Sequence, residues 1–340
     1  MLKFDDSMIL KTLFEEEVPV ETDPDTGEPT VVEIHKIIIR KTVEEDLDSE
    51  DKYEFNRIKD VYKTARETME DEGDYREWAR YYPENDLIED DIRENRMYLI
   101  CFWRYIPIKE DDDADNKKKK KKSKDNQDDD KIRYEIQETI HAVYVFNDHI
   151  ESDGFDPERY ISDDNGYRKD KEFAAVIPEK YFTLYTGSYK TVDNFTPVES
   201  QADKDLPDDL KPLAKDKYGR VKYASLERIA SDGELSGVFP NIVSYVSDFA
   251  CCLLLETNDL NVIMNKLLER YGFEKAGMII GVGHIPSTAY QYFCPVPVQE
   301  EEFDADDSFD DATPDEENSY GKTPDQLSDE TDDPAVETGE

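Results

Sequence analysis

The sequence lacks the features that mark secreted and membrane-spanning proteins. It has four cysteines and none stands at CxxC spacing, so a reduced, intracellular history is favoured over a disulfide framework. The longest unbroken apolar run, residues 249–255, is far shorter than the roughly 20 residues of a transmembrane helix. Asp5 and Asp6 stand where a signal peptide would have basic and apolar residues. We therefore expect a protein that does not span a membrane and is soluble or bound peripherally, with no membrane among its favoured partners. We expect it in the cytoplasm or elsewhere inside the cell, or in a virion.

Positive charge is also scarce. The sequence has 42 lysines and arginines and 84 aspartates and glutamates, which gives a formal net charge of −42. Because such a field repels DNA and RNA, direct nucleic-acid binding is disfavoured and partner proteins with basic surfaces are favoured. The run Lys117–Lys122 has the composition of a nuclear-localisation or phosphate-binding patch, but acids on both sides neutralise it.

Glycine-rich nucleotide loops and nucleophile elbows are missing as well. Gly281 and Gly283 begin a GxGxxG pattern, but Pro286 stands at its third glycine position, and no GxxxxGK[ST] occurs. His284 has no GxSxG elbow beside it, and the other histidines have none of the spacings of zinc ligands. We therefore predict no catalytic, cofactor-binding or metal-binding residue. Carboxylates are so abundant that a hydrolase using a pair of them stays open.

Apolar periodicity in the first half predicts strands around one long helix. Residues 1–43 form a hairpin, and residues 49–73 form a helix with one apolar stripe. Residues 97–106 and 132–146 predict a strand pair, and apolar and polar side chains alternate along most of the second strand. The connection between them, residues 109–131, holds nine acids and nine lysines and no large apolar residue, so it predicts a disordered insertion.

The most apolar stretch lies in the second half. Residues 239–255 predict a helix buried on most of its surface, and residues 257–271 predict a second helix that stops before Gly272. These two form a buried helical pair near the C-terminus. Residues 278–282 and 288–293 predict two further strands. The fold class that follows is α+β, with mixed or antiparallel sheet elements.

Composition shifts predict the domain organisation. We expect an N-terminal α+β domain over residues 1–192, a linker with three prolines over residues 193–217 and a C-terminal α+β domain over residues 218–298. Residues 299–340 predict a disordered acidic tail, because eighteen acids there face a single lysine.

Aromatic and arginine side chains gather in one short segment. Such a composition is typical of protein interfaces, where Tyr, Trp and Arg supply much of the binding energy. The alternative is that the rings cover the edge of the N-terminal core. The candidate partner-binding residues are Tyr75, Arg76, Trp78, Arg80, Tyr81 and Tyr82.

These features together favour a non-enzymatic component of a larger assembly that docks through proteins and can self-associate. A viral or phage virion component of the neck, tail or head is one concrete form. The alternative is an accessory protein of nucleic-acid metabolism, in which the acidic tail regulates binding. That alternative needs a basic, aromatic groove in the folded body.

Overall fold

The computed structural model describes most of the chain up to residue 297. The described residues are 4–48, 53–73, 78, 82–108, 133–148, 190, 192–198, 212–258, 260–280 and 286–297. The predicted insertion over 109–131 and the predicted tail over 299–340 lie outside them. No helix in the described ranges is long and apolar enough to cross a membrane.

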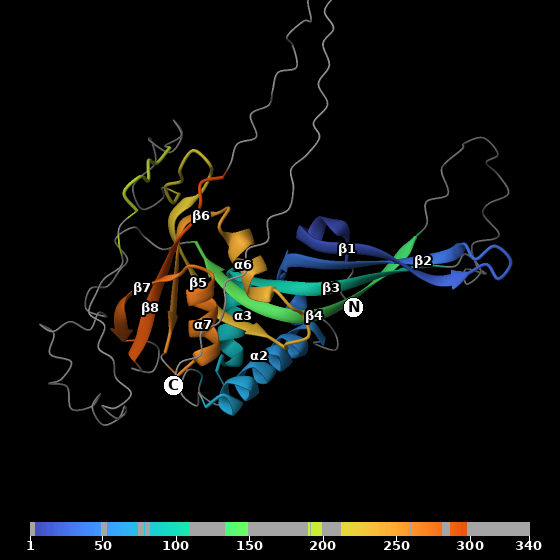
Figure 1. Ribbon diagram of the computed structural model, residues 1–340, viewed down its shortest axis with the longest axis horizontal. Coiled ribbons are helices and arrows are strands. Elements are labelled where there is room, and N and C mark those ends of the chain that lie inside the picture. Colours follow the sequence, from blue (N-terminus) through green and yellow to red (C-terminus); the bar gives the residue numbers. More distant parts are fainter. Residues whose placement is uncertain are drawn as a thin grey trace, which may run out of the picture. The chain divides into compact units, whose positions relative to one another are not determined.

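The described strands form one eight-stranded sheet in the order β1-β2-β3-β4-β5-β6-β8-β7 (Figure 1). Neighbouring strands are antiparallel except β5 and β6, which are parallel. The strands are β1 (Ile9–Thr22), β2 (Pro29–Lys41), β3 (Met97–Pro107), β4 (Tyr134–Asn147), β5 (Val221–Ser231), β6 (Ala250–Thr257), β7 (Glu274–Ile280) and β8 (Pro286–Phe293). The helices are η1 (Asp6–Met8), α1 (Glu45–Asp48), α2 (Tyr53–Asp71), α3 (Asn85–Arg93), α6 (Val238–Val246) and α7 (Val262–Arg270).

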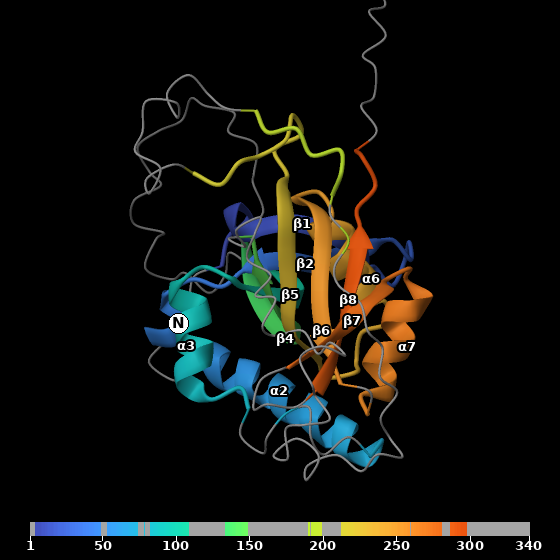
Figure 2. The same ribbon diagram turned by 90° about the vertical axis from the view of Figure 1, so that its left-hand side faces the viewer.

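Helices cover both faces of the sheet. Phe239 and Ile242 of α6 and Leu268 of α7 share one core cluster with side chains of β2 to β6 and β8. Ile58 of α2 and Ile88 of α3 belong to a second cluster with the opposite side chains of β2 to β5. We call these sides the α6 face and the α2 face. Figure 2 shows β5, β6 and β8 side by side, with α6 and α7 to the right of β8.

The α+β fold class is confirmed, and so are several elements of the first half. The hairpin predicted over residues 1–43 is β1 and β2, and the helix predicted over 49–73 contains α2. The pair predicted over 97–106 and 132–146 is β3 and β4, which run antiparallel. Alternation and turn residues predicted these elements because their packing is largely local.

The long helix predicted over residues 239–255 is wrong in its second half. Helix α6 ends at Val246, and the apolar run Cys251–Leu255 lies in strand β6. A strand buried on both faces is apolar at every position, so its sequence resembles that of a buried helix. Helices α6 and α7 are therefore separated in the sequence by strand β6.

The sheet continues across the predicted linker over residues 193–217. Strands β1 to β4 precede it, strands β5 to β8 follow it, and β4 pairs with β5. Met1–Pro297 forms one compact unit.

Adjacent leucines of α7 test this packing. Leu268 is fully buried in the α6-face cluster, whereas Leu267 is only partly buried at its margin. We expect Leu268→Ala to lower the free energy of unfolding by about 2–5 kcal/mol, the usual cost of truncating a core leucine. Leu267→Ala serves as the matched control and should cost less. Urea unfolding measures both, and equal losses would contradict the placement of α7.

Candidate active site

Strands β5 and β6 are paired along only part of their length. Their pairs run from Val221 with Ala250 to Ser225 with Leu254. Beyond that point β5 continues beside β4, and β6 continues beside β8. The facing edges of the two strands are not paired with each other there. Two neighbouring parallel strands that stop pairing while both continue must move apart. We call the region beyond the last pair, Ser225 with Leu254, the β5/β6 divergence.

A bulge in β5 lies directly after the last pair with β6. Val143 of β4 pairs with Ala230 of β5, and Val145 pairs with Glu227. Between these two pairs β4 has one residue and β5 has two, so β5 contains the extra residue. Arg228 within this interval has φ of 48°, a left-handed conformation that is uncommon for a side chain of this size. Bulges bend the strand that carries them, so this one accounts for the departure of β5 from β6.

Buried ion pairs hold the bulge in place. Arg228 donates two hydrogen bonds to Asp91 of α3, from Nε to Oδ2 at 3.0 Å and from Nη2 to Oδ1 at 2.9 Å. Arg96 Nη2 lies 3.0 Å from the same Oδ1, and the Asp91 side chain is 0% exposed. A left-handed residue of this kind costs about 1–3 kcal/mol and persists only where its surroundings fix it. The bidentate pair supplies that constraint.

Glu227 places a carboxylate next to the divergence. It lies two residues after Ser225, on the α2 face, and its side chain is 35% exposed. Ser225 Oγ donates to Glu227 Oε1 at 2.7 Å, and Arg228 Nη1 donates to Oε2 at 2.8 Å. The carboxylate is thus fixed in orientation while part of it stays accessible, as a group that accepts a proton requires.

Tyr62 of α2 is the first of three neighbouring aromatic rings. Tyr62 is buried, and its hydroxyl has no hydrogen-bond partner within the described structure. Burial raises the pKa of the Tyr62 phenol, so the hydroxyl keeps its proton at neutral pH. The Tyr62 ring lies 5.7 Å from that of Trp78, which lies 5.9 Å from that of Tyr82.

The predicted partner-binding segment is only partly described. Trp78 packs against the α2-face cluster, and the backbone oxygen of Tyr82 accepts a hydrogen bond from Arg66 at 2.7 Å. Partner binding by this segment stays a prediction. The residues Tyr75, Arg76, Arg80 and Tyr81 lie outside the described ranges.

The loop from β5 to α6 presents backbone amides at the carboxyl end of β5. Gly233 and Gly237 have φ of 82° and 73°, and both are exposed. Gly237 is the N-cap of α6 and has no side chain to cap the first turn. Backbone N–H groups at a helix N-terminus attract anions such as phosphate.

Two acidic residues, Asp232 and Glu234, lie in this loop, and the first has side-chain partners. Asp232 is held by Arg57 and by His141, whose Nδ1 lies 3.0 Å from Asp232 Oδ2. Glu234 follows on the loop as an exposed acid. No local spacing in the sequence pairs His141 with Asp232, because the two residues are 91 positions apart.

Comparison with known proteins gives likeness in structure alone. No protein-family model matches the chain, and no curated protein matches its sequence. The chain is similar to a GNAT-family acetyltransferase from Streptococcus agalactiae, with 14% identity and a TM-score of 0.38 over 76% of this chain and 95% of that one. It is also similar to Arabidopsis thaliana NAA60 in complex with acetyl-CoA, with 9% identity and a TM-score of 0.31 over 76% and 98% of the two chains.

This comparison contradicts the predicted non-enzymatic role. The solved structures it returns are acetyltransferases, whereas we expected a virion or other structural component, or an accessory protein of nucleic-acid metabolism. Those expectations are corrected. At these identities and TM-scores the likeness assigns no activity to this chain, so a function has to rest on its own strand pairing and side chains.

Asp91 tests how the bulge is held. We expect Asp91→Ala to lower the free energy of unfolding by about 3–5 kcal/mol, because it leaves Arg228 and Arg96 without their buried partner. Asp90→Ala is the matched control, since Asp90 is the exposed neighbour on α3 and surface changes stay within about 0.5 kcal/mol. Chemical unfolding compares the two, and equal stabilities would show that the pair does not hold the bulge.

Proposed function

We propose that the chain is an acyltransferase that takes its acyl group from a coenzyme A thioester bound in the β5/β6 divergence. The observation that carries the proposal is the end of β5–β6 pairing at Ser225 and Leu254 while both strands continue. Beyond that pair β5 pairs with β4 and β6 pairs with β8, and the two strands do not pair with each other. An extended ligand that contains amides can bind along a strand edge in the way an added strand does.

Coenzyme A combines the two chemical features that this region accommodates. Its pantetheine arm is extended and carries two amides, which suit the facing edges of β5 and β6. Its pyrophosphate suits the amides of the first turn of α6, which begins at Val238 after the uncapped Gly237. The loop glycines support this fit, since a Cβ at Gly233 would meet no atom within 4 Å and the exposed backbone is open to a ligand.

The direction of the ligand follows from the fold. With the phosphates at the α6 N-terminus, the sulfur end of the arm points toward the last β5–β6 pair, where Glu227 and Ser225 lie. Bound there, the thioester supplies an activated acyl carbon. Glu227 would accept the proton of an attacking amine as the nitrogen–carbon bond forms and the carbon–sulfur bond breaks. Ser225 and Arg228 orient that carboxylate.

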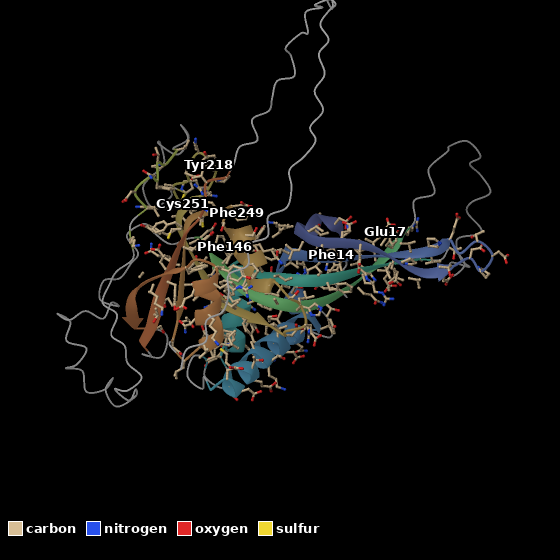
Figure 3. All side chains as sticks on the ribbon, in the orientation of Figure 1. Phe14, Glu17, Phe146, Tyr218, Phe249 and Cys251 are labelled. Carbon is tan, nitrogen blue, oxygen red and sulfur yellow. The ribbon has the colours of Figure 1, made fainter. Side chains whose placement is uncertain are left out.

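Binding of coenzyme A tests the ligand assignment. Isothermal titration should give saturable binding by the full chain. Glu234→Lys should tighten it by about threefold or more at low salt, because it replaces a charge that repels the phosphates with one that attracts them. Glu17→Lys makes the same change on the distant β1–β2 hairpin, where Figure 3 labels Glu17, and should leave affinity unchanged. Absence of binding, or equal gains in both variants, would contradict the assignment.

Glu227 can be tested separately from binding. We expect Glu227→Gln to lower the rate of acyl transfer to an amine by about 100-fold, the lower range of general-base contributions. Affinity for coenzyme A should stay within about twofold, because the amide keeps the shape of the side chain. Thiol release measured in the presence of acetyl-CoA and a peptide amine gives the rate. Unchanged turnover would remove Glu227 from the proposed mechanism.

A further inference from the structure

Two residues that precede β5 in the sequence, Lys190 and Val192, contact the α2 face of the sheet. Val192 packs against a small buried cluster formed by Tyr223, Cys252 and Leu254. Its backbone N–H donates to the Tyr223 hydroxyl at 3.1 Å. Two residues earlier, the backbone N–H of Lys190 donates to Gln291 Oε1 at 2.7 Å. We call the described residues Lys190 and Val192 the strap.

The strap crosses the sheet where the divergence begins. Ser225 pairs with Leu254, and Leu254 pairs with Gln291, so these three residues form one row across β5, β6 and β8. Tyr223 lies two residues before Ser225 on the same face, about 7 Å along the strand. One hydrogen bond of the strap reaches Tyr223 of β5 and the other reaches Gln291 of β8, on either side of β6. Both lie near the last β5–β6 pair, where the proposed acyl-binding region ends.

The side chain of Gln291 has an unused donor beneath the strap. It is 1% exposed, and its Nε2 has no hydrogen-bond partner among the described residues, while its Oε1 accepts from the backbone N–H of Lys190. A buried N–H without an acceptor is unfavourable, which indicates that the site suits a ligand carrying a carbonyl oxygen. A peptide offers both the N–H that Oε1 accepts and the carbonyl that Nε2 lacks.

We infer that the acceptor substrate is an extended peptide that binds across β5, β6 and β8 in place of the strap, and that the strap competes with it. This inference rests on the proposed acyltransferase function. The peptide takes a small apolar side chain in the position of Val192, gives its N–H groups to Tyr223 and Gln291, and gives a carbonyl to Gln291 Nε2. The bound strap thus acts as an autoinhibitory segment of the chain.

The strap can be displaced without touching the sheet. Val192→Asp places a charge in the cluster of Tyr223, Cys252 and Leu254. Val198→Asp is the matched control, because Val198 follows in the same described segment but is exposed. The probe is a fluorescent peptide with the sequence of residues 188–196, and its binding is followed by anisotropy. We expect Val192→Asp to bind it at least about tenfold more tightly than the wild type, in which the tethered strap competes at high effective concentration.

A second change identifies the site of binding. In the Val192→Asp background, Gln291→Leu keeps the volume but removes both polar groups of the amide, and should weaken peptide binding by about tenfold. A thermal melt confirms that each variant is folded, and Val192→Gly replaces Val192→Asp if the latter is not. Binding no tighter than wild type in the displaced variant, an equal gain in Val198→Asp, or no effect of Gln291→Leu would overturn the inference.

The peptide assay contains no coenzyme A, so its outcome is separate from that of the proposed function. Peptide binding without coenzyme A binding would leave a peptide-binding surface and overturn the acyltransferase. Coenzyme A binding without peptide binding in any displaced variant would keep the acyltransferase and overturn the peptide acceptor.

Discussion

The ion pair between Arg228 and Asp91 is the constraint on which the candidate site depends. It crosses from β5 to α3 and fixes a left-handed residue inside a strand. The bend at that residue separates β5 from β6 and leaves β5 attached to β4. The sheet thereby gains a place where an extended ligand can pair with two strands without breaking any pair between them.

The net negative charge of the chain also affects how an anionic ligand can bind. An anionic ligand has to approach a protein with a formal net charge of −42, so local compensation matters more than usual. Arg57 forms an ion pair with Asp232 at the β5 end, and Arg228 forms one with Glu227 at the other end. Salt screens the charges beyond about 8 Å near 0.15 M, which leaves these short-range pairs to define the site.

The sequence predicted the elements whose packing is local. The hairpin of β1 and β2 and the pair of β3 and β4 show their alternation and turns directly. Cys251–Leu255 was assigned to a helix because a central strand and a buried helix share the same apolar run. The domain division near residue 193 stays a prediction, and strand β4 before it pairs with β5 after it.

The candidate site could not be predicted from the sequence for a different reason. Glu227 and Arg228 are ordinary charged residues in a sequence full of them, and Asp91 lies 137 positions from Arg228 along the chain. A bulge has no residue signature when it carries Arg in place of Gly. Gly233 and Gly237 before an apolar helix were the local signal that could have directed attention to the α6 N-terminus.

Amide hydrogen exchange with and without coenzyme A is the sharpest test of ligand binding between β5 and β6, because it reports on the backbone groups that the ligand would bond. Binding in the β5/β6 divergence predicts slower exchange on ligand addition in β5 after Ser225, in β6 after Leu254 and at Val238 and Phe239 of α6. The β1–β2 hairpin, marked by Phe14 in Figure 3, should be unaffected. Unchanged exchange in β5 and β6 at saturating coenzyme A would contradict it.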